Sequence, residues 1–193
     1  MAIEPLADNS FWDFSLALYA SESVAQQCLA LQDDWDADVN LLLYGIWLAH
    51  HGIGWSDDAV KTLQAEFDPW RKITIVPLRT VRRRLRFQTK RRYYNFLKDL
   101  ELRAERRQQD RLWLHWLADY CDVHDAEHTS FSAPGPVAAD SFQQALQENL
   151  LVYLKRLEMR PRSQVMHPKV DDQLDSLISA VVAQRASAVL SER

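Results

Sequence analysis

The chain has 193 residues, of which 47% are apolar, and this is enough to build a packed core in one domain or slightly more. It has four glycines and seven prolines, and long stretches repeat apolar side chains with a helical period. Composition and patterning therefore predict an all-α protein rather than a sandwich, a barrel or a Gly-loop nucleotide enzyme. The GxxxxGKS/T, GxGxxG, GxSxG and HExxH patterns are absent, which argues against P-loop, Rossmann, α/β-hydrolase and zincin chemistry.

The formal net charge of −4 hides a strong segregation of charge along the chain. Residues 1–70 carry a net charge of −11, residues 71–111 carry +11, and the remaining residues carry −4. An acidic segment followed by an equally basic one allows two interpretations. Either the two parts pair within the molecule, or the basic part binds a separate anion. The sequence alone leaves both open.

A compact core of short helices is expected over residues 8–68. The segment 39–50 is apolar on nearly all sides, which is typical of a helix at the centre of a core. Gly52 and Gly54 follow it as stop signals, and Ser56 is placed to begin the next helix.

An acidic turn precedes this central helix. Asp36 and Asp38 suit the positively polarised N-terminus of a helix, so we expect them to cap it rather than to bind a cation. An EF-hand loop starting at Asp34 is excluded. It would place Val39 where the loop needs glycine, and Gly45 where it needs a bidentate glutamate.

Two histidines, His50 and His51, stand at the other end of the central helix. A protonated imidazole interacts favourably with the negative end of a helix dipole. We therefore expect both to be protonated there and assign them no further role.

A basic helical arm is expected over residues 69–120. Asp68 and Pro69 predict its start, as an N-cap followed by proline in the first turn, and Pro77 predicts a kink. Beyond the kink, basic side chains recur at helical spacing on the side opposite an apolar edge. The members of this basic stripe are Arg79, Arg82, Arg83, Arg86 and Lys90. The arm is either a helical hairpin or one long helix.

The arm and the core together form a predicted helical domain over residues 1–120. A linker is expected over residues 121–137, followed by a C-terminal helical segment over residues 138–193. This segment is expected to form two helices separated by a second, proline-bounded linker at 160–168. The sequence does not decide whether this helical pair packs on the core.

The first third of the chain resembles a known family. The stretch FWDFSLALYASESVAQQCLALQDDWDADVNLLLYGIWLA is similar to the shared block of an uncharacterised family of small, all-helical proteobacterial proteins, a domain of unknown function. The residues that carry the likeness are Phe11, Trp12, Phe14, Ser15, Leu16, Tyr19, Cys28, Leu29, Leu31, Gln32, Asp33, 38–43 and Trp47. The resemblance covers residues 10–115 and implies a bacterial, cytoplasmic, all-α protein. Because the family's function is unknown, it assigns no catalytic or binding residue.

One set of residues resembles a transition-metal site. The run CDVHDAEH has Cys-x2-His-x3-His spacing, and zinc in a structural site takes four ligands of this kind. Short runs rich in His and Asp are also common in solvated loops, which is the alternative interpretation. The candidate ligands are His115, Cys121, His124 and His128. No other cofactor is expected.

The absence of a catalytic motif leads us to expect no enzymatic activity. The main hypothesis is a non-enzymatic adaptor or regulator that binds another protein through the basic stripe. The second is sequence-tolerant binding of RNA or DNA through the same arm, helped by neighbouring aromatic side chains. The third is a metalloprotein or enzyme built around the histidine and cysteine set.

The expected location is the cytoplasm. Cys28 and Cys121 lie far apart in the sequence, and acidic residues interrupt the apolar stretch at the N-terminus, unlike a signal peptide. No run reaches the roughly 20 apolar residues that a membrane span needs. Homo-oligomerisation is left open.

Overall fold

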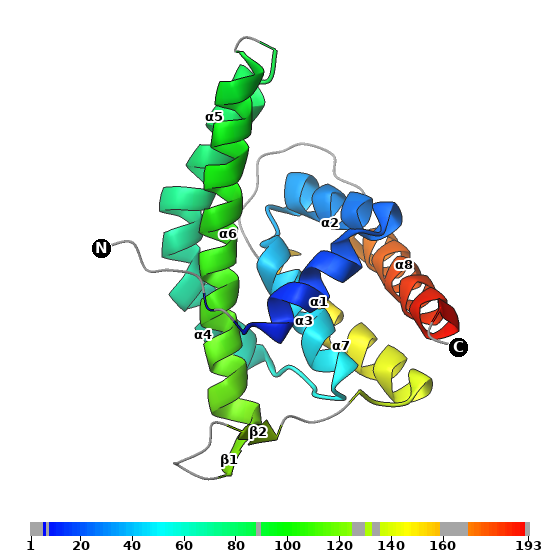
Figure 1. The fold of residues 1–193 in the computed structure, drawn as a ribbon. Coiled ribbons are helices and arrows are strands. Elements are labelled where there is room, and N and C mark those ends of the chain that lie inside the picture. The colour runs from blue at the N-terminus through cyan, green and yellow to red at the C-terminus, as the bar shows by residue number, and fades with distance from the viewer. Residues whose placement is uncertain are drawn as a thin grey trace.

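The computed structural model describes residues 6, 8–87, 90–124, 130–132, 136–158 and 170–191. The fold is all-α, as predicted, with one small β-ribbon (Figure 1). The helices are α1 (Ser10–Tyr19), α2 (Glu22–Trp35), α3 (Val39–His50), α4 (Asp57–Trp70), the π-helix η1 (Arg71–Ile75), α5 (Val76–Leu85), α6 (Arg91–Tyr120), α7 (Ala139–Glu158) and α8 (Val170–Ser191). The strands are β1 (Asp122–His124) and β2 (Ser130–Ser132). Within the described part of the chain, every helix is too short or too polar to cross a bilayer.

Side-chain caps fix where the early helices begin. Asp38 caps α3, because its carboxylate accepts a hydrogen bond from the backbone N of Asn40 at 2.9 Å, and this confirms the capping prediction for Asp38. The same prediction is wrong for Asp36. That residue ends α2 in the left-handed conformation, with φ of 51°, and turns the chain toward α3. Ser56 caps α4 by accepting from the backbone N of Ala59 at 3.2 Å.

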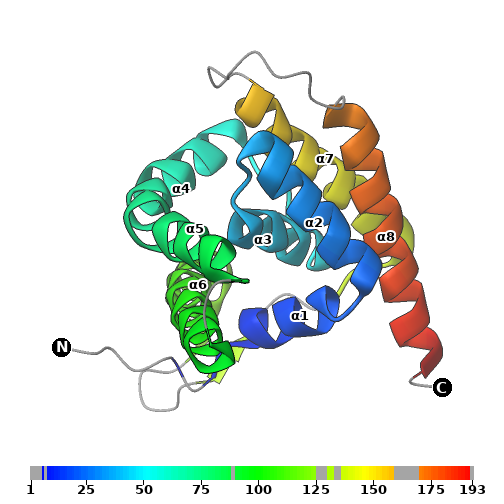
Figure 2. The same cartoon turned by 90° about the horizontal axis from the view of Figure 1, so that it is seen from above.

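Helix α3 lies at the centre of the molecule, as its apolar sequence predicts. All of residues 40–49 are buried. Helices α1, α2, α6 and α7 surround it (Figure 2). The hydrophobic core is one cluster that joins side chains from the first helices with side chains from α7 and α8. The C-terminal helical pair therefore packs on the core, a point that the sequence leaves undecided.

A buried amide on α7 holds this helix to the end of α3. Asn149 is fully buried and donates to the carbonyls of Gly45, at 3.1 Å, and Ile53, at 2.9 Å. It also accepts from the backbone N of Trp55 at 2.6 Å. A Cβ atom on Gly45 would lie 3.1 Å from the Trp55 ring, so the chain leaves little space for a larger residue there. These contacts fix the position of α7.

Helix α8 completes the body by packing along α2 and α7. Its inward side chains repeat at helical spacing, as the sequence predicts. They are Val170, Leu174, Leu177 and Val181. Gln173 adds a polar contact by donating to Asp34 Oδ2 at 2.6 Å.

The helix start predicted at Asp68 and Pro69 is wrong. Helix α4 continues through Pro69 to its last residue and then into η1 and α5. Phe67 and Ile75 are buried on either side of this proline. A helical path that continues through Pro69 keeps both of these apolar side chains away from water, which favours it over a break.

The kink predicted at Pro77 corresponds to a change of helix type just before it. Proline has no N–H, so it cannot donate to the carbonyl four residues earlier in the α-helical pattern. In η1, the N–H of Val76 bonds to the carbonyl of Arg71, five residues earlier, in the wider π-helical turn.

Of the two forms predicted for the basic arm, the structure has the hairpin. Helix α5 packs against the first half of α6. With 30 residues, α6 is about 45 Å long at 1.5 Å per residue. It runs from the hairpin turn past α1 and α3 to the β-ribbon (Figure 1).

The expected linker over residues 121–137 contains β1 and β2. These strands pair antiparallel, with Val123 opposite Phe131. Residues 125–129 and 133–135 of this linker lie outside the described residues, as does the whole of the second expected linker at 160–168.

Candidate functional site, an inner cavity and a basic hairpin tip

A cavity of about 300 Å³, named here the inner cavity, lies between the first three helices, η1 and the α5–α6 hairpin. The helices that contribute to its wall are seen from above in Figure 2. Aromatic and aliphatic side chains of α1 and α3 form part of the wall, while arginines of α5 and carboxylates and amides of α6 form another part. This volume is at the small end of the usual range for ligand pockets, about 300–1,000 Å³.

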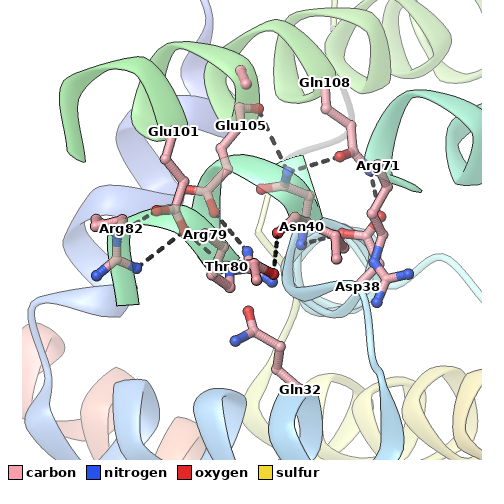
Figure 3. A network of polar contacts seen from close by, with 12 residues as sticks. Gln32, Asp38, Asn40, Arg71, Arg79, Thr80, Arg82, Glu101, Glu105 and Gln108 are labelled. Atoms are coloured by element: carbon pink, nitrogen blue, oxygen red, sulfur yellow. Dashed lines mark hydrogen bonds and ion pairs between the residues drawn. The ribbon is translucent and has the colours of Figure 1, made fainter. Parts of the chain in front are cut away.

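Two arginines of the predicted basic stripe, Arg79 and Arg82, line this cavity and pair with α6 (Figure 3). Arg79 donates from Nε to Glu101 at 3.0 Å and from Nη2 to Glu105 at 2.9 Å. Arg82 binds both carboxylate oxygens of Glu101 and donates to Tyr94 Oη at 3.3 Å. The side chains of Arg79 and Arg82 are only 13% and 21% exposed. For these two residues, the positive charge is neutralised within the hairpin.

The two glutamates of this network have opposite pKa shifts. Burial alone would raise the pKa of Glu101, but hydrogen bonds from Arg82 and Arg79 outweigh it and hold the pKa below its usual value. Within the described residues, Arg79 is the one arginine that pairs with the Glu105 carboxylate, and burial outweighs this pairing and raises the pKa of Glu105. The hydrogen bond from Arg82 to Glu101 also raises the pKa of that arginine.

A second polar network lies at the N-terminus of α3, on another part of the cavity wall. Gln108 donates to Asp38 Oδ2 at 2.6 Å and accepts from Asn40 Nδ2 at 3.1 Å. Gln109 donates to Asn40 Oδ1 at 2.9 Å. Burial raises the pKa of Asp38 although these hydrogen bonds oppose the shift. The chain thus places a buried carboxyl beside two amides of α6.

The acidic turn is held by an arginine rather than by a group of metal-binding side chains. Arg71 is buried and donates from Nη2 to the backbone carbonyl of Asp36 at 2.8 Å, while its guanidinium also pairs with the Asp36 carboxylate. Among the residues that the structure describes, no three or more His, Cys, Asp or Glu side chains come together in a way that could hold a metal ion.

The other three residues of the basic stripe lie nearer to solvent. Arg83 is 46% exposed and pairs with Asp33 of α2 at 2.9 Å. Arg86 and Lys90 are exposed where α5 turns into α6. Between them, these three positions lead from the cavity to the end of the hairpin.

We call residues 84–96 the hairpin tip, of which the structure describes 84–87 and 90–96. Three aromatic side chains are exposed on it: Phe87 at 89%, Phe96 at 59% and Tyr93 at 48%. The Arg86 guanidinium lies 5.3 Å from the centre of the Phe87 ring, and that of Arg92 lies 4.6 Å from the Tyr93 ring. Exposed cations and exposed aromatic rings therefore lie together at the hairpin tip, which protrudes from the helical body (Figure 1).

The candidate metal ligands are not gathered in the described part of the chain. His115 hydrogen-bonds through Nε2 to Glu66 at 2.9 Å, and Cys121 is buried at the end of α6. His124 lies in β1, and the placement of its side chain is outside what the structure describes. His128 lies outside the described residues.

The expectation of a protonated His50 is wrong. Burial, with the neighbouring charges of His51 and Arg185, lowers the pKa of His50 to about 4. Its ring packs against Phe14 with 5.3 Å between ring centres. The apolar surroundings therefore outweigh the helix dipole, and the imidazole is neutral at pH 7.

Sequence reasoning missed the line of polar residues on the inner side of α6. Glu101, Glu105 and Gln109 recur at intervals of four, which places them on one helical face, and all three line the cavity. This period was the available signal. Arg79 and Arg82 are three residues apart on α5, which also places them on one helical face, and a hairpin brings the two faces together.

The fold and the cavity define a class: an all-α protein with a polar cavity between its N-terminal helices and a basic helical hairpin. The particular family follows from comparison. The chain belongs to the family described as "Protein of unknown function (DUF2390)", which matches residues 10–112 and confirms the resemblance seen in the sequence. The match includes every residue that lines the inner cavity and ends before α7. Neither the curated proteins nor the solved structures include a match to this chain.

Proposed function

We propose that this protein is a non-enzymatic, cytoplasmic adaptor that binds an acidic surface of another protein through the hairpin tip. One observation carries the proposal: the tip combines exposed arginines with exposed aromatic rings at an end of the hairpin that projects from the helical body (Figure 1). Arg, Tyr and Trp are the residue types most enriched at the energetic centres of protein interfaces.

The contact surface in this proposal is shifted along the hairpin from the sequence-based one. Arg79 and Arg82 already pair with glutamates of α6, so they contribute little free charge to a partner. Arg84, Arg86 and Arg91 are exposed, and no ion pair links them to the described residues. These three supply the cationic part of the proposed surface.

A protein partner suits the charge of the whole chain better than a long polyanion does. Residues 1–70 carry −11, and they form the helices on which the hairpin rests. A long nucleic acid held at the tip would meet this negative body and be repelled by it. A compact acidic patch on a protein contacts the tip alone.

Binding of RNA or DNA is the second candidate. It is favoured by the absence of any Asp or Glu residue between Asp68 and Asp99. Every charged residue of the hairpin tip is therefore a cation. Exposed rings beside arginines also suit stacked bases. Such binding would weaken steeply with salt, as counterions are released from the phosphates.

The test is a pull-down from native lysate, with and without nuclease, that compares the wild-type chain with two charge-reversal triples. One triple changes the tip residues Arg84, Arg86 and Arg91 to Glu. The other, a control with the same change in net charge, changes Lys61, Arg103 and Lys155 to Glu; all three are exposed and lie elsewhere on the surface.

The proposal predicts a protein partner that resists nuclease, is retained by the control triple and is lost by the tip triple. Recovery that nuclease abolishes would place nucleic acid first. Equal recovery by all three proteins would contradict both candidates.

A further inference from the structure

Two residues that line the inner cavity each carry a deeply buried polar atom without a hydrogen-bond partner in the described part of the chain. The two atoms are Ser15 Oγ and Gln109 Oε1, and each residue is only 3% exposed. The amide nitrogen of Gln109 donates to Asn40. The amide oxygen can only accept a hydrogen bond, and it lacks a donor among the described residues. Because buried polar groups in proteins are almost always paired, the cavity calls for an occupant that carries a hydrogen-bond donor.

The ion pair between Arg79 and Glu105 leaves one group open on each partner. Arg79 engages Nε and Nη2, and Glu105 engages Oε1. No hydrogen bond within the described residues occupies Arg79 Nη1 or Glu105 Oε2. Glu105 and Gln109 are four residues apart on α6, so their open acceptors are neighbours on one face. A cationic donor thus lies beside two acceptors.

From this arrangement we propose that the inner cavity binds a zwitterionic α-amino acid with an apolar side chain. The carboxylate of the ligand binds Arg79 Nη1, and its ammonium group binds Glu105 Oε2 and Gln109 Oε1. An α-amino acid carries both charges on one carbon, which suits a donor and an acceptor already held together by an ion pair. Ser15 Oγ supplies one further hydrogen bond to the head group.

The rest of the wall suits the apolar side chain of such a ligand. Trp12, Leu16 and Leu43 line the same cavity. Its volume of about 300 Å³ is room for roughly ten water molecules, which is comparable to the bulk of a large amino acid.

The cavity wall has five basic side chains, Arg71, Arg79, Arg82, Arg83 and Lys98, and three acidic ones, Asp38, Glu101 and Glu105, so a ligand that carries both charges can pair with each kind. A plain carboxylate would lie near Glu101 and Glu105, and a plain amine would lie near Arg79 and Arg82, with no opposite charge of its own. The ammonium group beside Glu105 also favours the ionised form of that carboxyl, which burial disfavours. The competing account is that the cavity holds only water.

The test is calorimetric titration of the full chain with L-leucine and L-phenylalanine. We expect saturable binding of one ligand per chain for at least one of them. Analogues that lack one charge should bind at least about tenfold more weakly, because each leaves a charged group of the site unpaired. For phenylalanine these are 3-phenylpropionate and phenethylamine; for leucine they are 4-methylpentanoate and 3-methylbutylamine.

A matched pair of variants locates the binding. Leu16→Trp places a large ring in the cavity wall, whereas Leu114→Trp places the same ring on α6 away from the cavity; the two leucines are 50% and 51% exposed. Leu16→Trp should weaken binding at least about tenfold and Leu114→Trp should leave it unchanged, with circular dichroism confirming that both fold.

The inference is overturned if neither amino acid binds saturably up to about 10 mM, well beyond the range of a specific site. It is equally overturned if the analogues bind as tightly as the amino acid, or if both tryptophan variants bind alike. These outcomes are independent of the hairpin tip, whose charge-reversal triple leaves the cavity wall unchanged.

Discussion

Arg82 binds both carboxylate oxygens of Glu101, and this contact joins α5 to α6 inside the hairpin. Arg79 bonds to the same carboxylate, so one anion serves two cations. The Glu101 side chain is 7% exposed, which places the shared charge largely out of water. Loss of the Glu101 carboxylate would leave two partly buried guanidinium groups, those of Arg79 and Arg82, short of a counter-charge.

We therefore expect Glu101→Gln to lower the free energy of unfolding by about 3 kcal/mol, because removing one partner of a buried ion pair exposes the full desolvation cost of the other. Urea denaturation followed by circular dichroism measures it. Glu66→Gln is the control, since Glu66 pairs with a half-exposed Arg111, and it should cost about 1 kcal/mol or less. Equal losses in the two variants would show that the shared carboxylate has no special weight.

The buried amide of Asn149 gives a second expectation. Asn149→Leu keeps the approximate volume but leaves the N–H of Trp55 and the carbonyls of Gly45 and Ile53 without their partner. We expect a loss of about 3 kcal/mol in thermal or urea unfolding. Gln144→Leu, at an exposed position on the same helix, should change stability by about 0.5 kcal/mol or less. A stable Asn149→Leu variant would mean that α7 is held by apolar packing alone.

His50 makes stability depend on pH. The folded chain holds its pKa near 4, while an unfolded histidine titrates near 6.5. As the pH falls from about 6.5 to 4, the unfolded state therefore binds a proton that the folded state refuses, so stability is complete above this range and declines within it.

After allowance for the partial exposure of His50, this decline amounts to about 1–2 kcal/mol. His50→Phe removes the titrating group and keeps a ring against Phe14. The free energy of unfolding of this variant should fall less than that of the wild type between pH 6.5 and pH 4. Identical curves would show that the imidazole is protonated in the folded state.

Local patterns in the sequence were sufficient for the all-α fold and for the central place of α3, although the helix start expected at Asp68 and Pro69 was wrong. A segment that is apolar on every side must be covered on every side, and residues 40–49 are. Which helices cover it was not predictable in this way. The contact of Asn149 with the end of α3 joins positions about a hundred residues apart and depends on backbone groups that carry no sequence signal.

The candidate site was likewise predictable from the sequence only in part. The spacing of Arg79, Arg82 and Arg83 correctly places them along one part of a helix, but the sequence does not say what that part faces. In the hairpin, Glu101 and Glu105 face the first two arginines, and this leaves the tip as the free cationic surface. Ser15 Oγ and Gln109 Oε1, which have no hydrogen-bond partner within the described residues, belong to α1 and α6, and only the folded chain brings these residues to one cavity.

The most direct test of the proposed adaptor function is photo-crosslinking from the hairpin tip in native lysate. A benzophenone side chain would replace Phe87, which is 89% exposed at the tip, and in a control it would replace Leu114, which is 51% exposed on the same hairpin's second helix but far from the tip. The account predicts a discrete protein adduct from position 87 that resists nuclease and is missing from position 114. The absence of any adduct specific to position 87, or an adduct that nuclease removes, would contradict it.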